Sequence, residues 1–171
     1  MNKIINEMTD KLLANSTNKL ALKALEKLFN TGIPFNRQHK FKFTAISEGK
    51  TQLKLPHIRA NKNHLGGIHA CATATLGEYA AGLTLIKKFS SSKYRLVMSK
   101  MEADYIKQAK EDLYGVVEIE KEELERIENE LAAGDKSEIT IVTNIFTKED
   151  EIIAVIQTSW QLKKWNRVTY K

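Results

Sequence analysis

Glu78 is the residue whose surroundings in the sequence point most clearly to chemistry. It lies in the middle of the run HACATATLGEYAAGLTLIKK, residues 69–88, which is apolar or small on every side. In a helix, its neighbours three and four residues away would all be small: Ala74, Thr75, Ala81 and Gly82. An unpaired carboxylate in apolar surroundings is costly, so we expect a partner from another element or a cavity, with a raised pKa.

The segment before this run, residues 63–70 with the sequence NHLGGIHA, is the second candidate. Gly66 and Gly67 permit tight turning and close approach of a ligand. A helix that begins near His69 would present free backbone N–H groups, such as that of Ala70, at the positive end of its dipole. Such groups can polarise a carbonyl oxygen or hold an oxyanion, and Asn63 could orient a group by hydrogen bonding. The plainer alternative is a loop that leads into a helix, with His69 as a capping or packing residue.

The spacing between the two candidates restricts how they could cooperate. His69 and Glu78 are nine residues apart, which in a helix corresponds to about 14 Å of rise and about 180° of rotation. They cannot serve one small reactive group from the same chain. Any mechanism that uses both therefore predicts an obligate dimer, with the start of one helix facing the Glu78 of the other chain.

Two simpler interpretations remain open at this stage. Glu78 could be a satisfied buried carboxylate, with an arginine such as Arg95 or Arg59 as its partner. Cys71, near the expected helix N-terminus, could be a nucleophile with a lowered pKa. We favour a buried structural role for Cys71, because no histidine and third orienting residue are visible beside it in the sequence.

Composition limits the other classes of function. The single cysteine excludes a disulfide framework and a Cys-rich metal site, and no pair among the four histidines has an HxxxH or HExxH spacing, so we expect no metal. Net charge is +7 over residues 1–60, +3 over 61–115 and −4 over 116–171. The basic half could attract nucleic acid, anionic lipid or a phosphorylated cofactor. No basic motif interleaved with aromatic residues is present, so we expect a solvated surface and no nucleic-acid partner.

Hydrophobic periodicity predicts an α+β architecture with one core. Residues 1–31 read as a helical extension, residues 41–55 as a hairpin and residues 69–88 as one long buried helix. Four strand-like runs follow, with a bulge near Ser99 and Lys100 and an amphipathic helix over 120–133. We expect a curved antiparallel sheet, ending in a four-strand meander, wrapped around the buried helix.

The same pattern sets the expected domain limits and location. Residues 1–171 are predicted to form one domain, with the extension over 1–31 and the core over 33–165. Glu78 in the middle of the apolar run argues against a membrane span. The first residues lack a secretory apolar core, so a cytoplasmic protein is the default expectation.

The motif Asn63-x-x-Gly66-x-x-His69, followed nine residues later by the acid in Leu76-Gly77-Glu78-Tyr79-Ala80, resembles the signature of hotdog-fold acyl-CoA thioesterases. The most similar types are the phenylacetic-acid-pathway and 4-hydroxybenzoyl-CoA enzymes, together with a bacterial subgroup of that superfamily. The runs NHLGGIHACATATLGEYAAG and YRLVMSKMEADYIKQAKEDL and a late Trp-containing strand carry the likeness, over roughly residues 33–165. The family's curved sheet around one helix agrees with the periodicity.

This resemblance implies hydrolysis of an acyl-CoA or acyl-carrier-protein thioester by a homodimer, or by a dimer of dimers. Glu78 corresponds to the general base or nucleophile, the backbone N–H near Ala70 to the group that polarises the carbonyl, and His69 and Asn63 to positioning residues. Five residues are implied in substrate binding: Gly66, Gly67, Ile68, Ala70 and Thr75. Coenzyme A would enter as part of the substrate, with no separate cofactor.

Two departures from the family pattern affect rate and substrate more than fold. Ala70-Cys71 stands where the family commonly has Gly-Gly after the histidine, and Glu78 replaces the Asp of many relatives. Two alternatives to an enzyme remain. One is a non-catalytic hotdog protein that binds acyl-CoA or acyl chains as a sensor or carrier. The other is a structural dimer in which an arginine pairs with Glu78 across the interface.

Overall fold

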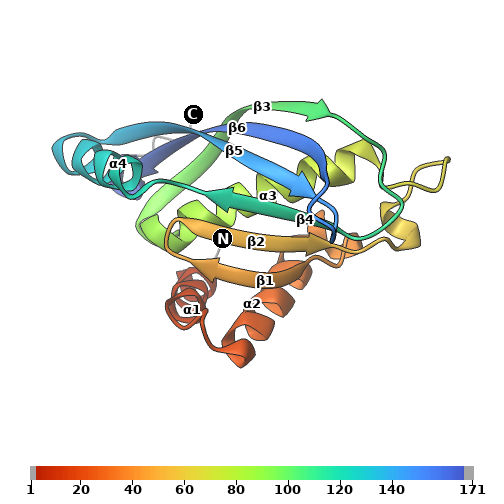
Figure 1. The fold of residues 1–171 in the computed structure, drawn as a ribbon. Coiled ribbons are helices and arrows are strands. Elements are labelled where there is room, and N and C mark those ends of the chain that lie inside the picture. The colour runs from red at the N-terminus through yellow and green to blue at the C-terminus, as the bar shows by residue number, and fades with distance from the viewer. Residues whose placement is uncertain (1–2, 168–171) are drawn as a thin grey trace.

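The computed structural model describes residues 3–167 and shows an antiparallel sheet that curves around one long helix (Figure 1). The helices are α1 (Lys3–Ala14), α2 (Lys19–Gly32), α3 (Ala70–Phe89) and α4 (Lys121–Ala133). The strands are β1 (Lys42–Ser47), β2 (Lys50–Leu55), β3 (Tyr94–Tyr105), β4 (Leu113–Glu118), β5 (Lys136–Phe146) and β6 (Ile152–Lys164). Short 3₁₀ turns are η1 (Asn36–Gln38), η2 (Arg59–Asn61) and η3 (Trp165–Arg167). The predicted α+β class and the central helix are confirmed.

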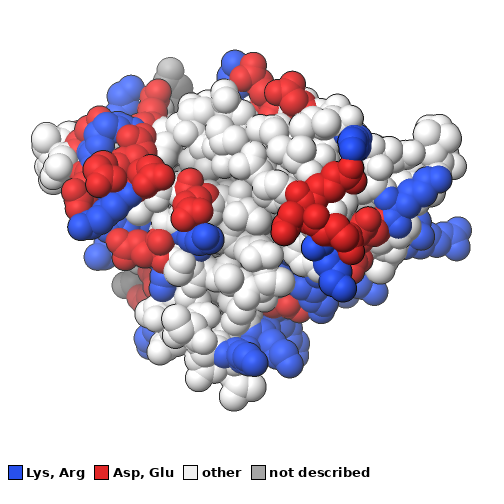
Figure 2. Space-filling model, in the orientation of Figure 1, with Lys and Arg blue, Asp and Glu red and all other residues white. Residues whose placement is uncertain are grey.

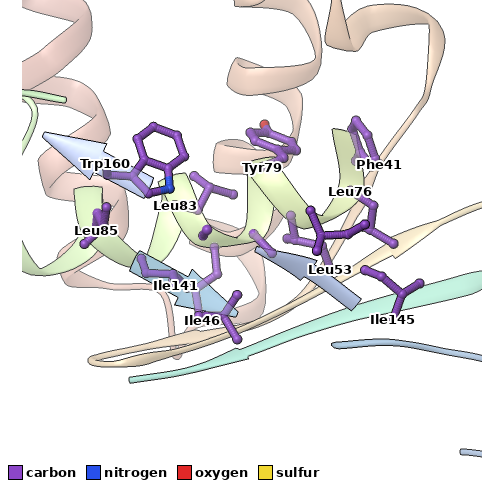
Figure 3. Close-up of a cluster of buried hydrophobic side chains, with 14 of the residues drawn as sticks. Phe41, Ile46, Leu53, Leu76, Tyr79, Leu83, Leu85, Ile141, Ile145 and Trp160 are labelled. Carbon is purple, nitrogen blue, oxygen red and sulfur yellow. The ribbon is translucent and has the colours of Figure 1, made fainter. Parts of the chain in front are cut away.

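The 20-residue helix α3 forms the centre of the core, and small side chains let it approach the sheet closely. A Cβ atom on Gly77 would lie 2.5 Å from Cβ of Ile156 on β6, a distance that forces something to shift. In Figure 3, Leu76 points from α3 toward Leu53 and Ile145 of the sheet, while Tyr79 and Trp160 lie on the other side of the helix. The side of α3 that carries Leu76 therefore packs on the sheet, and the side that carries Tyr79 faces other parts of the chain.

The strand order is β1-β2-β4-β5-β6-β3, so the predicted four-strand meander is wrong. Strands β4, β5 and β6 are consecutive neighbours, but β3 crosses to the far edge and pairs antiparallel with β6. Alternation in a sequence reports which face of a strand is buried and not which strand lies beside it. The sheet therefore extends from β1 at one edge to β3 at the other and curves around α3, which lies against one of its faces (Figure 1).

Strand β3 carries the predicted bulge and forms one edge of the sheet. Its register against β6 shifts between Met98 and Lys100, as the change of phase in the sequence indicated. Among residues 3–167, β3 pairs with β6 alone. Val97, Met101 and Tyr105 are large apolar or aromatic side chains that this edge strand leaves exposed. A long edge strand with exposed apolar residues is a template for pairing with another chain.

The amphipathic helix α4 buries the face that its pattern predicted. Helix α4 buries Leu124, Ile127 and Leu131, and its glutamates face outward in the acidic area at the left of Figure 2. Helix α2 buries Leu25 and Phe29 against the core. Within the described part of the chain, no helix is long and apolar enough to cross a membrane.

Candidate functional site

The Glu78 carboxylate lies in the wall of a cavity of about 310 Å³, called here the Glu78 cavity. Its side chain is largely buried, and this burial raises the pKa of Glu78 to about 6. Within residues 3–167 it forms no ion pair, and neither Arg59 nor Arg95 reaches it. A carboxylate with a pKa near neutrality and no internal partner is suited to accept a proton at physiological pH.

The walls of the Glu78 cavity come from four parts of the chain. Helix α3 provides the floor through Glu78, Gly82 and Ile86. Helix α2 and the turn after it provide one wall, and strands β3 and β6 provide the other, through Phe29, Ile33, Phe35, Leu96 and Trp160. Most of this lining is apolar or aromatic, which is typical of small-molecule sites.

The start of α3 is a capped helix N-terminus with a free donor. The His69 ring is the N-cap, and its Nδ1 accepts a hydrogen bond from the Cys71 N–H at 3.1 Å. A neutral His69 ring therefore carries its proton on Nε2, where it is a donor. The Ala70 N–H donates to no acceptor among the described residues. A free N–H at the positive end of a helix dipole is able to polarise a carbonyl oxygen or hold an oxyanion.

Asn63 shapes the loop before α3. Its Oδ1 accepts hydrogen bonds from the N–H groups of Leu65 at 2.9 Å and Gly67 at 3.2 Å. Gly66 has φ +79°, a left-handed conformation that favours glycine. A Cβ on Gly67 would lie 2.8 Å from Gln108, so this glycine is required by the neighbouring β3–β4 connection. The Asn63 side chain thus acts on the loop backbone and fixes where α3 begins.

Two further cavities flank the start of α3. The His69 cavity, about 210 Å³, is lined by Thr75, Cys71 and His39 among others. The Asn63 cavity, about 320 Å³, is lined on the other side of the helix by Asn63, Ile68, Ala70 and Tyr105, among others. Buried Ile68 donates its N–H to the Ala109 carbonyl at 2.9 Å, and this bond ties the loop to the β3–β4 connection.

Cys71 and Thr75 differ in their contacts. Cys71 is exposed, so the expectation of a buried structural cysteine is wrong. It lies in the first turn of α3 and lines the His69 cavity. Thr75 is buried and its Oγ1 donates to the Cys71 carbonyl at 2.8 Å, a bond within the helix. No group of three His, Cys, Asp or Glu side chains that could hold a metal ion occurs between residues 3 and 167.

A buried His39–Asn61 pair, not found from the sequence, braces the His69 cavity. Asn61 Nδ2 donates to the carbonyls of His39 at 3.0 Å and Pro56 at 2.8 Å. Asn61 Oδ1 lies 2.8 Å from His39 Nδ1 and must therefore accept the proton of that nitrogen. His39 Nε2 is buried without a described partner. The sequence feature that could have indicated a buried His39 is its position between Phe35 and Phe41. The rings of these two residues pack against the His39 ring.

The candidate residues are thus divided between three cavities. His69 and Thr75 line one, Asn63 and Ala70 line another, and Glu78 lines the third. Because α3 is a continuous helix, His69 and Glu78 are held about 14 Å apart along its axis.

An antiparallel sheet wrapped around one long buried helix defines the hotdog fold, and solved structures agree with this assignment. A Pseudomonas aeruginosa protein of unknown function, described as a "Probable Thioesterase", has 22% sequence identity, covering 83% of this chain and 95% of that chain with a TM-score of 0.75. A thioesterase from Haemophilus influenzae has 11% identity, covering 87% and 94% with a TM-score of 0.68. A mutant of a thioesterase enzyme from Staphylococcus aureus has 19% identity, covering 75% and 98% with a TM-score of 0.63. At these identities the likeness establishes the fold.

Residues 22–162 match the family described as "Domain of unknown function (DUF4442)", and the chain belongs to this family. No curated protein matches the chain. The matched region begins within α2, so the family includes the helix that forms one wall of the Glu78 cavity. The narrower likeness to phenylacetic-acid-pathway and 4-hydroxybenzoyl-CoA enzymes stays a prediction.

Proposed function

We propose that the protein hydrolyses an acyl thioester, carried by coenzyme A or by an acyl carrier protein. The observation that carries this proposal is the Glu78 carboxylate, which has a pKa of about 6 and lies in an apolar cavity without an internal partner. Such a group can take a proton from water beside a bound acyl group. The names of several solved hotdog structures support the same class of reaction.

In the proposed reaction Glu78 accepts a proton from water, and the water oxygen forms a bond to the thioester carbonyl carbon. The resulting oxyanion is stabilised by the free Ala70 N–H at the start of α3. Collapse of the tetrahedral intermediate breaks the C–S bond, and the leaving thiolate takes the proton from Glu78. His69 fixes the first turn of α3 and offers its Nε2–H as a second donor, while Asn63 holds the loop that precedes it.

Two chains are needed for this arrangement, because one α3 holds His69 and Glu78 far apart. Edge strand β3, with exposed Val97 and Met101, is suited to pair with a second copy. Tyr105 at the end of β3 donates to the Ala70 carbonyl at 3.0 Å, so this edge is connected to the start of α3. We therefore propose a homodimer in which Glu78 of one chain faces the start of α3 in the other.

The test is thiol release from short, long and aromatic acyl-CoA esters by the wild type, Glu78→Gln and the control Glu149→Gln. Glu149 is an exposed carboxylate in the turn before β6. Multiple turnovers that fall 10²-fold or more in Glu78→Gln alone would support the proposal. Light scattering coupled to size exclusion should show a dimer, and Met101→Asp should weaken it.

Absence of turnover with every CoA ester and with acyl carrier protein, in a folded dimer, would refute the hydrolase. If such a dimer still bound acyl thioesters, the function would be that of an acyl sensor or carrier.

A further inference from the structure

Helix α2 turns three lysines and one leucine away from the core. Its buried residues are Leu25 and Phe29, and its exposed residues lie on the opposite side of the helix. The lysines follow one another at intervals of four residues, so they share one face of the helix. Leu20, beside them in the first turn of α2, is 77% exposed and is the most exposed large apolar side chain among residues 5–167. This surface is called here the α2 lysine face, and it consists of Lys19, Leu20, Lys23 and Lys27.

The acidic side chains of the two N-terminal helices leave this positive charge unbalanced. Asp10 on α1 faces the body of the protein, where its Oδ2 accepts hydrogen bonds from the hydroxyls of Ser90 and Ser92, each at 2.6 Å. Glu26 on α2 forms an ion pair with Lys42 at 2.9 Å. Within residues 3–167, the ammonium groups of the α2 lysine face take part in no ion pair. In Figure 2 the lowest part of the molecule, where Figure 1 places α1 and α2, is accordingly blue and white.

Helix α1 packs beside α2 and also exposes an apolar side chain. Its buried side is polar, because Asn6 and Thr9 lie there, each with an oxygen that has no hydrogen-bond partner among the described residues. Glu7, Met8 and Lys11 are exposed. The outer side of α1 therefore adds one apolar side chain to the surface beside the α2 lysine face and leaves its net positive charge unchanged.

Two hydrogen bonds hold the α1–α2 hairpin on the body of the protein. Ser16, in the turn between the helices, donates its hydroxyl to the Ile46 carbonyl at 2.8 Å, and Lys87 Nζ on α3 donates to the Leu13 carbonyl at 2.6 Å. The hairpin is thus a fixed support. Like charges at intervals of four residues destabilise a helix, and an exposed leucine gains nothing from burial. A partner with negative charge and hydrocarbon would offset both effects.

We propose that the α2 lysine face docks this protein on the surface of a lipid bilayer that contains anionic phospholipids. The lysines lie among the phosphate groups, and Leu20 enters the boundary between headgroups and acyl chains. No exposed residue of α2 is arginine or aromatic, so the face lacks side chains that bind phosphate with two hydrogen bonds or stack on bases. This composition favours lipid over nucleic acid. The inference does not rest on the proposed thioesterase function.

The first experiment is sedimentation of the full-length protein with vesicles of phosphatidylcholine alone and of phosphatidylcholine mixed with phosphatidylglycerol. We expect binding to the anionic vesicles only, and its loss when the salt concentration is raised from about 0.05 to 0.5 M. Replacement of Lys19, Lys23 and Lys27 together by glutamine should lower the partition coefficient about 10²-fold, at about five-fold per lysine. Leu20→Ser should lower it about ten-fold.

The matched control replaces three exposed lysines outside α1 and α2 by glutamine, which removes the same charge: Lys110, Lys136 and Lys148. Its partition coefficient should stay within about three-fold of that of the wild type, because these charges lie away from the docked surface. Thermal unfolding followed by circular dichroism checks that every variant is folded. Thiol release from soluble acyl-CoA esters should be the same in both lysine variants and the wild type, so docking and the proposed function are tested separately.

A fluorescent reporter tests the orientation of the docked protein. Leu20→Trp should shift the tryptophan emission to shorter wavelength with anionic vesicles, and Val142→Trp, at an exposed site on β5, should not. The inference is overturned if the wild type binds no vesicles, if both lysine variants lose binding equally, or if binding does not depend on anionic lipid. It is also overturned if a short DNA or RNA duplex binds the α2 lysine face at least as tightly as the anionic vesicles do.

Discussion

Replacement of Glu78 by glutamine should stabilise the folded protein above pH 6. The pKa of this carboxyl is raised to about 6 in the folded state by burial, from an ordinary value of 4.5. The folded chain therefore binds this proton more tightly than the unfolded chain, and stability falls as pH rises from about 4.5 to 6. The full difference is about 2 kcal/mol, and partial exposure of the side chain reduces it to about 1–2 kcal/mol. Glutamine removes this penalty.

The assay is chemical and thermal unfolding of the wild type, Glu78→Gln and the control Glu149→Gln at pH 4, 6 and 8. At pH 8 the melting temperature of Glu78→Gln should exceed that of the wild type by roughly 2–8 °C. At pH 4 the difference should vanish, because the wild-type carboxyl is then protonated in both states. A less stable Glu78→Gln at pH 8 would refute the reasoning and would indicate a cation from a second chain beside Glu78.

Three further predictions follow from the same contacts. The kcat/KM of the wild type should fall below about pH 6 as Glu78 becomes protonated, and a pH–rate profile flat down to pH 5 would contradict Glu78 as the base. His69→Ala removes the N-cap and should lower the free energy of unfolding by about 1 kcal/mol, measured in urea; an unchanged midpoint would contradict a capping role. Gly77→Ala places a Cβ 2.5 Å from Ile156 and should cost about 1–3 kcal/mol, whereas Gly32→Ala, which meets no atom within 4 Å, should cost nothing of that kind.

The parts of the fold predicted from the sequence are those that periodicity determines locally. The run that is apolar on every side predicted α3, and the change of phase after Met98 predicted the bulge in β3. The spacing of Leu124, Ile127 and Leu131 predicted the buried face of α4. The placement of β3 at the far edge was missed, since it depends on how the β3–β4 connection passes the start of α3. The hydrogen bond from the Ile68 N–H to the Ala109 carbonyl fixes the β3–β4 connection beside the start of α3. No local sequence pattern predicts this bond.

The candidate site shows the same division. Isolation of Glu78 among small residues was visible in the sequence, because its neighbours on a helix are known from spacing alone. The α2 wall of its cavity was not visible, because Phe29 and Ile33 lie more than forty residues away in the sequence. The His39–Asn61 pair was missed for the same reason, since its hydrogen bonds join residues separated by 22 positions.

Two glycines of α3 connect the fold to the proposed chemistry. Gly77 lets the helix approach Ile156 on the sheet side, while Tyr79 on the opposite side of α3 packs against the rings of Phe29, Phe41 and Phe43. Gly82 lets α3 lie close to the Trp160 ring, from which a Cβ on Gly82 would be 3.2 Å away, and both residues line the Glu78 cavity. A helix held this rigidly cannot bend its own start toward Glu78, so motion within one chain cannot complete the site. If Glu78 and the start of α3 act on one thioester, the same packing that creates the cavity makes the second chain necessary.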